Sequence, residues 1–241
     1  MKTVASICLI LMACSCHAEQ RLSTEHGPTA QPIAGSQPDF AGFDEFIARV
    51  LKEWRVPGVA VAVVVGDEVV LAEGYGYRDL EKRLPVTAQT LFPIASITKC
   101  FTATAAALLV DDGKLHWNDR VREHLPDFRL HDEQAAAELT IRECLSHQTG
   151  LPLECYRWYG ARGWSEKDFT SEKVYQTLRF LEPSAPVGTR FIYSNSGYLI
   201  TGQMIDKYGG SWEQFIERRL LDPLGMTRTN FSVAESQAHT N

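Results

Sequence analysis

Ser96 and Lys99 are the residues of this sequence whose types and spacing best suit catalysis. They stand in the segment LFPIASITKCFTATAAALLV, where a run of small and apolar residues predicts a helix over residues 98–111, ended by Gly113. Residues three apart on the first turn of a helix share one face, with Cβ atoms about 5–6 Å apart, so the ammonium group can reach the hydroxyl. Because apolar surroundings disfavour a charged lysine, its amine can take the serine proton and make the hydroxyl a nucleophile.

The segment FIYSNSGY contributes a second pair, Tyr193 and Asn195. In an extended segment these alternate residues project to the same side. A phenol there can pass protons between a nucleophile and a leaving group, and a carboxamide can hold a substrate carbonyl group. Taken singly, each pair also has a plain structural explanation, because a serine can cap a helix beside a solvated lysine, and a tyrosine can lie at a core edge beside a turn asparagine. The presence of both pairs in one chain favours a catalytic set.

Hydrophobic periodicity predicts the elements that must position these residues. Apolar residues at three- and four-residue intervals predict a helix over residues 43–54, and residues 59–65 and 69–77 predict a β-hairpin with at least one buried strand. No helix follows the GYG at residues 74–76, so we interpret it as a twisted strand end rather than a phosphate loop. Further helices are predicted in the segment LTIRECLSH and over residues 166–181, 198–208 and 211–220, the last capped by Ser211.

Together the two pairs and their surroundings resemble the serine β-lactamase and penicillin-binding-protein superfamily, in particular its class C β-lactamase, esterase and D,D-peptidase branch. The resemblance runs from about residue 40 to residue 231 and includes TLFPIASITK, LTIRECLSHQTGLP and PVGTRFIYSNSGYLITGQMI. It implies an α+β fold of the β-lactamase/transpeptidase type, with an antiparallel sheet flanked by helices plus an all-α subdomain. It also implies that Ser96 is acylated, that Lys99 and Tyr193 share the proton transfers, and that Asn195 orients the substrate amide, with no cofactor or metal.

The function that the resemblance implies is a serine hydrolase that acts through an acyl-enzyme on an amide or ester. It leaves open whether the substrate is a β-lactam, a D-alanyl peptide or a carboxylic ester. A non-catalytic sensor that binds penicillin or peptidoglycan is the alternative. The expected partner is a small molecule or a cell-wall peptide, because a formal net charge of -6 and the lack of a basic run argue against nucleic acid. The oligomeric state is not predicted.

A third motif of the family is missing from this sequence. After Asn195 there is no triplet of Lys or His, then Thr or Ser, then Gly. In the family this triplet lies on a strand that lines the pocket and supplies a second oxyanion N–H group. Only about ten residues follow Thr229, where the family has further strands and a last helix. We therefore expect a hydrolase domain over residues 40–241 that is incomplete at its C-terminus, and an inactive fragment is a further alternative.

The N-terminal eighteen residues have the pattern of an export signal, with Lys2 before an apolar run of about ten residues and small residues after it. The run is too short to span a bilayer. The sequence LMAC predicts lipidation at Cys14, which the crowding of three cysteines favours over plain cleavage after Ala18. Residues 19–39 are polar and predict a flexible tether. The protein is therefore expected to be exported, either periplasmic, anchored to a membrane through a lipid, or secreted.

Three cysteines remain beyond the signal, Cys100, Cys144 and Cys155. Their odd number and spacing favour buried thiols over a disulfide between the last two, and no pair has metal-ligand spacing.

His147, in LSHQTG, is expected to pack and form hydrogen bonds rather than to catalyse. His116, His124 and His131 are expected to face water. The aromatic segment YRWYG at residues 156–160 either lines the site entrance or anchors a long loop, and the sequence favours neither.

Overall fold

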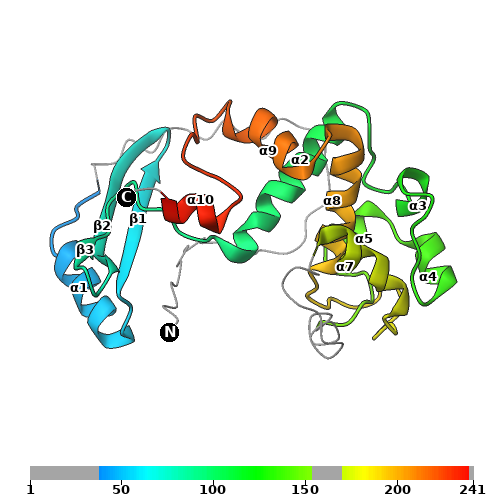
Figure 1. The fold of residues 1–241 in the computed structure, drawn as a ribbon, viewed down its shortest axis with the longest axis horizontal. Helices are drawn as coiled ribbons and strands as arrows, with labels where there is room; N and C mark the ends of the chain where they lie inside the picture. Colours follow the sequence, from blue (N-terminus) through cyan, green and yellow to red (C-terminus); the bar gives the residue numbers. More distant parts are fainter. Residues whose placement is uncertain (1–37, 154–169, 239–241) are drawn as a thin grey trace, which may run out of the picture. The chain divides into compact units, whose positions relative to one another are not determined.

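The computed structural model describes residues 38–153 and 170–238 of the 241-residue chain. These residues form two compact units, one of them Ala95–Phe231 and the other built from the residues before and after it (Figure 1). We call Ala95–Phe231 the second unit and the other one the first unit. The first unit holds a sheet, and the described part of the second unit is helical. The predicted α+β class with an all-α part is therefore confirmed. The predicted signal, most of the predicted tether, Cys155 and residues 156–160 lie outside the described residues.

The first unit is a helix on an antiparallel sheet. Helix α1 (Phe43–Trp54) precedes strands β1 (Gly58–Val65), β2 (Glu68–Asp79) and β3 (Leu84–Pro85), which pair in the order β1-β2-β3. A two-residue loop that begins at Gly66, with φ +61°, joins β1 to β2, as expected where the hairpin needs a left-handed residue. Helix α10 (Val233–Ala238) belongs to the same unit.

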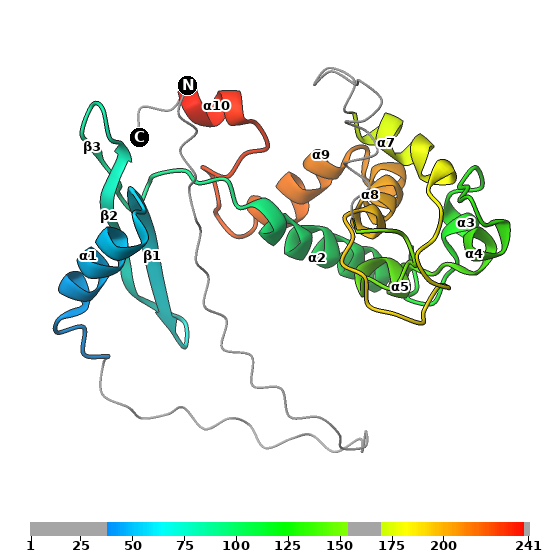
Figure 2. The ribbon, with the colours of Figure 1, turned by 90° about the horizontal axis from the view of Figure 1, so that it is seen from below.

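Helix α1 is attached to β2 near the N-terminus of the helix (Figure 2). The rings of Phe43 and Tyr75 meet edge-on with their centroids 6.2 Å apart, and the Tyr75 hydroxyl donates to Asp44 at 3.0 Å. Burial and this carboxylate together raise the pKa of Tyr75. Because Asp44 also lies in the first turn of α1, it complements the positive end of the helix dipole.

The prediction that the hairpin contains a buried strand is wrong for the described residues. Gly58 is the one buried residue of β1, whereas Val64, Val65 and Val69 are 60%, 50% and 65% exposed. Their β-branched side chains favour the extended backbone, but α1 packs on β2 and leaves them uncovered in the described chain. Apolar composition thus predicted the strands correctly and their burial incorrectly.

The second unit is a set of helices around a shared apolar core (Figure 1). Helix α8 packs against four neighbours, namely α2, α5, α7 and α9. The core is built from aliphatic and aromatic side chains that include Leu109, Phe128, Ile141 and Ile200. None of the helices in the two described ranges is long and apolar enough to cross a bilayer. The bounds of the elements of this unit are η1 (Ala95–Ile97), α2 (Thr98–Asp111), α3 (Val121–His124), α4 (Glu133–Glu138), α5 (Ile141–Leu145), α7 (Ser171–Thr177), η3 (Leu178–Phe180), α8 (Ser196–Gly209), α9 (Trp212–Ile216) and the π-helical turn η4 (Glu217–Leu221).

Most predicted helices of this unit are present. Helix α2 has the predicted bounds, and Gly113 follows it with φ +68°. Ser211 caps α9 by accepting from the Gln214 N–H group, as predicted. The helix predicted over residues 166–181 begins only at Ser171 within the described chain, because Thr170 is its N-cap. Helices α3 and α4 were not predicted, since four and six residues are too short to show a period.

Gly197 allows α8 to lie directly on α5. A Cβ atom at this position would be 2.1 Å from the carbonyl oxygen of Cys144 and 2.8 Å from its carbonyl carbon. Both are backbone atoms of α5, so a side chain cannot be accommodated by a rotamer change. Because Gly197 is the second residue of α8, this contact fixes the start of the helix, which follows directly on Tyr193 and Asn195.

Replacing Gly197 by Ala is expected to reduce the free energy of unfolding by about 1–3 kcal/mol or more, because α5 and α8 must move apart. The matched control is Gly202→Ala in the same helix, where the nearest neighbour of an added Cβ atom is a Trp212 ring carbon at 3.9 Å. That change is expected to be neutral, or stabilising by up to about 1 kcal/mol through helix propensity. Urea unfolding of the two variants measures the difference, and equal stability would refute the close contact.

Candidate active site

Ser96, Lys99 and Tyr193 form a connected set of polar side chains in the second unit. The Ser96 Oγ atom lies 2.7 Å from the Tyr193 hydroxyl and accepts a hydrogen bond from Lys99 Nζ at 3.2 Å. Three of the four predicted site residues are therefore brought together, although Tyr193 lies 97 residues beyond Ser96 in the chain. A serine hydroxyl with two such partners has a proton acceptor and a cation within direct reach.

Ser96 lies just before α2 rather than within it. It is the middle residue of the 3-10 turn η1, and α2 begins two residues later. Ala95 precedes it with φ +46°, a left-handed conformation that costs a residue with a Cβ atom about 1–2 kcal/mol. The predicted spacing of one turn between Ser96 and Lys99 is still met, because the 3-10 turn leads directly into the helix.

Lys99 is half-buried between two aromatic rings and does not extend into bulk solvent. Its Nζ atom lies 4.8 Å from the ring centroid of Tyr193 and 5.5 Å from that of Tyr198. Each ring face attracts a cation, so the ammonium group is held beside Ser96 without a carboxylate partner. Tyr198 is itself fixed, since its hydroxyl donates to the Leu145 carbonyl oxygen at 2.9 Å.

The phenol of Tyr193 is tuned toward its ionised form. Hydrogen bonds from Lys99 and Ser96, together with the positive charge of Lys99, lower the pKa of Tyr193, and partial burial opposes them. The side chain is 37% exposed, so it is accessible to a substrate and its charge is partly screened by water. A phenolate at 2.7 Å from a serine hydroxyl is placed to remove its proton.

Asn195 lies at the start of α8 and not in an extended segment. Its backbone has φ −77° and ψ −16°, so the predicted alternation of Tyr193 and Asn195 on one side of a strand is wrong. The reason is local: the Ser194 Oγ atom accepts from the Ser196 N–H group, which starts the helix here. No hydrogen bond joins the Asn195 carboxamide to Ser96 in the described part of the chain, so this fourth residue is not part of the hydrogen-bonded set.

His147 lies next to the site. The sequence predicted only that it packs and forms hydrogen bonds. Its ring centroid lies 4.5 Å from that of Tyr193, and its Nδ1 atom lies 3.1 Å from the Ser194 N atom. Burial and the charge of Lys99 lower the pKa of His147, while its bond to Ser194 opposes them. The motif LSHQTG was a signal for this residue, but it gave no indication that His147 contacts the segment of Tyr193.

The other histidines divide between the surface and the core. His116 and His131 are exposed, as predicted. The prediction that His124 faces water is wrong, because its side chain is buried between the Tyr208 hydroxyl at 2.7 Å and Asp119 Oδ2 at 2.9 Å. This pair of partners satisfies both ring nitrogens and explains why a histidine can be buried here.

The thiols also differ from one another. Cys144 is buried as predicted, and burial raises the pKa of its thiol. Cys100 is exposed, which contradicts the prediction of a buried side chain, because it is on the outer face of α2 next to Lys99. Both are free thiols, and the described residues contain no cluster of ligands that could hold a metal ion.

A shallow pocket of about 240 Å³ lies elsewhere in the second unit. It is lined by Trp117, Arg142, Leu145 and Ser146, and none of the four predicted site residues lines it. This pocket therefore does not mark the candidate active site, which is defined by the hydrogen bonds of Ser96.

Comparison with known proteins gives one family match that spans most of the chain. The sequence model of the family described as Beta-lactamase matches residues 43–241. An unguisins hydrolase, ungD, of Aspergillus violaceofuscus is 33% identical over 213 residues, and Protein flp of Staphylococcus aureus is 31% identical over 194 residues. The aligned regions cover 86% and 78% of this chain but only 37% of each relative, so the chain spans little more than a third of their length.

Solved structures show the same relationship. The octameric penicillin-binding protein homologue from Pyrococcus abyssi superposes with a TM-score of 0.73 at 34% identity, over 84% of this chain and 47% of the other. The D-amino acid amidase from Ochrobactrum anthropi, in complex with D-phenylalanine, gives a TM-score of 0.64 at 27% identity, over 81% and 54%. The predicted β-lactamase/transpeptidase-like fold is thereby confirmed.

Replacing Lys99 by Ala is expected to raise the pKa of Tyr193 toward its ordinary range, because the cation and its hydrogen bond favour the phenolate. Tyrosine labelled with ¹³C at Cζ reports this titration by NMR, with Tyr193→Phe used to assign the signal. Lys114→Ala is the matched control, since Lys114 is an exposed lysine placed after the end of α2. An unchanged Tyr193 titration in the Lys99 variant would refute the coupling.

Proposed function

This chain belongs to the beta-lactamase family, and from that premise we propose that it is a serine hydrolase which forms an acyl-enzyme on Ser96 with an amide or ester. The observation that carries the proposal is the double contact of the Ser96 hydroxyl, 2.7 Å from a phenol with a lowered pKa and 3.2 Å from an ammonium group. A helix cap needs neither partner, so this arrangement favours a nucleophile over a structural serine.

In the proposed acylation step, the Tyr193 phenolate removes the proton of Ser96 while Oγ attacks the substrate carbonyl carbon. A new C–O bond forms, and the π electrons of the carbonyl group move to its oxygen. Helix α2 begins two residues after Ser96, so the positive end of the helix dipole favours this oxyanion. General base catalysis of this kind contributes about 10²–10⁴-fold to the rate.

The tetrahedral species then collapses to the acyl-enzyme. The carbonyl group re-forms, the C–N or C–O bond to the leaving group breaks, and Tyr193 returns its proton to the departing nitrogen or oxygen. Water releases the acyl group by the same steps in reverse order, with Tyr193 accepting a proton from water and Ser96 recovering its hydroxyl proton. The proton count balances, since each proton taken from a nucleophile is given to a leaving group.

The proposal gives Lys99 an electrostatic part rather than the part of sole proton acceptor that its spacing first indicated. Its contacts with two ring faces and its hydrogen bond to Ser96 hold the Nζ atom beside both Tyr193 and Ser96. The positive charge of Lys99 stabilises the Tyr193 phenolate, and the phenolate takes the proton of Ser96. Asn195 remains our proposal for the residue that orients the substrate carbonyl, because it lies two residues after Tyr193 and its carboxamide can donate to a carbonyl oxygen.

The proposed substrate class is an amide or ester outside the cytoplasm, either a β-lactam, a D-alanyl peptide or a simple carboxylic ester. An amide substrate is supported by the D-amino acid amidase, because 54% of the amidase chain superposes on this chain. The penicillin-binding protein homologue and the unguisins hydrolase are compatible with the same chemistry.

Intact-protein mass spectrometry with a fluorescent penicillin and a p-nitrophenyl ester tests the acyl-enzyme. The wild-type chain is expected to gain the mass of the acyl group and to release p-nitrophenol, and Ser96→Ala is expected to do neither, because the nucleophile is gone. Ser171→Ala, an exposed serine at the start of α7, is the matched control and should behave as wild type.

The two functions predicted from the sequence give different results in this experiment. A lasting adduct at Ser96 without release of product would identify a sensor rather than a hydrolase. A folded chain that forms no adduct with either reagent would contradict both.

A further inference from the structure

We infer that His147 is a positioning residue, which holds the Tyr193 phenol at Ser96 by binding the backbone on both sides of Tyr193. The inference rests on the proposed function, and it assigns to His147 a part that its motif did not reveal.

The first observation is that His147 binds both neighbours of Tyr193. The Ile192 N–H group donates to the carbonyl oxygen of His147 at 2.8 Å. On the other side, the Nδ1 atom of His147 lies 3.1 Å from both the N and the O atoms of Ser194. Nδ1 accepts from the N–H group in one tautomer and donates to the carbonyl group in the other, so the attachment is made in either form.

The second observation is that His147 adopts a backbone conformation that a histidine disfavours. It follows the last turn of α5 with φ +60°, and the Gln148 N–H group donates to the Glu143 carbonyl oxygen at 2.9 Å. This is the pattern of a helix C-terminus at which glycine is usual. A side chain in this conformation is strained, and such strain persists where the surroundings require that residue.

The third observation is that the ring of His147 packs among aromatic rings and not in solvent. Its neighbours are Tyr193 with centroids 4.5 Å apart, Tyr198 at 5.3 Å and Phe191 at 5.4 Å. The cation of Lys99 is close enough to disfavour an imidazolium ion. The neutral ring therefore predominates at neutral pH and packs against the phenol of Tyr193.

A histidine that only ended helix α5 would respond differently to mutation from one that positions Tyr193. His147→Gly relieves the left-handed strain, so for a helix cap alone it should be tolerated or stabilising. It also removes the bond to Ser194, so for a positioning residue it should release the segment of Tyr193. His147→Asn is the conservative variant, because asparagine tolerates the left-handed conformation and its carboxamide can pair with the Ser194 backbone.

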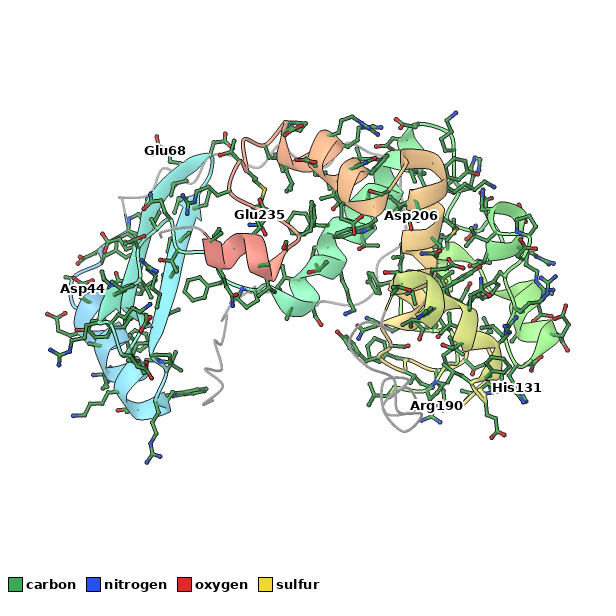
Figure 3. All side chains as sticks on the ribbon, viewed as in Figure 1. Asp44, Glu68, His131, Arg190, Asp206 and Glu235 are labelled. Atoms are coloured by element: carbon green, nitrogen blue, oxygen red, sulfur yellow. The ribbon has the colours of Figure 1, made fainter. Side chains whose placement is uncertain are left out.

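The experiment compares these two variants by Tyr193 titration and by ester hydrolysis. In His147→Gly the Tyr193 ¹³Cζ titration is expected to move upward, as in the absence of Lys99, and kcat is expected to fall about 10²-fold with a much smaller change in KM, as for a misplacement of about 1 Å. His147→Asn is expected to restore most of both. His131→Ala is the control, an exposed histidine at the outer margin of the helical unit (Figure 3).

Each remaining outcome bears on the inference. A folded His147→Gly variant with an unchanged Tyr193 titration would overturn it, and so would equal losses in His147→Gly and His147→Asn, because the bond to Ser194 would then not be the cause. The titration does not depend on turnover. A wild-type chain that hydrolyses no ester, but whose Tyr193 titration shifts in His147→Gly, would refute the proposed function and leave the positioning of Tyr193 supported.

Discussion

The hydrogen bond between Ser96 and Tyr193 is the interaction on which the candidate site depends. It joins the start of α2 to the loop before α8, two segments that are 97 residues apart. Its 2.7 Å length is set by the packing of helices rather than by local sequence, because α8 is held against α2 and α5 in one core. The direct contact of Gly197 with the Cys144 carbonyl group belongs to the same packing, since it fixes the start of α8 directly after Asn195.

The positive charge of Lys99 acts on two ionisable rings, those of Tyr193 and His147. Lys99 lowers the pKa of Tyr193 through its hydrogen bond and its charge, and burial lowers the pKa of His147, to which the charge of Lys99 adds. The same ammonium group therefore favours the charged form of the phenol and disfavours the charged form of the imidazole. Both effects favour the phenol rather than the imidazole as the charged ring beside Ser96.

Local patterns predicted the elements better than they predicted contacts. The composition of residues 98–111 was sufficient for α2, and Ser211 was recognisable as a cap. The contact of Tyr193 with Ser96 came from resemblance to a family and not from spacing. The burial of His124 could not be predicted, because one of its two partners, Tyr208, is 84 residues away. The short helix α4 depends on a cap, in which Asp132 accepts from the Gln134 and Ala135 N–H groups, rather than on a hydrophobic period.

Backbone strain in this unit coincides with the residues that hold the reacting groups. Of the non-glycine residues with positive φ in the described part of the second unit, Ala95 directly precedes Ser96, and His147 binds the two neighbours of Tyr193. Glycine would adopt both conformations without the cost of about 1–2 kcal/mol each. An alanine and a histidine at these positions cannot be explained by the needs of the turns alone. The core around α8 offsets their cost, and a fixed distance between a hydroxyl and a phenol is the property that the strained backbone provides.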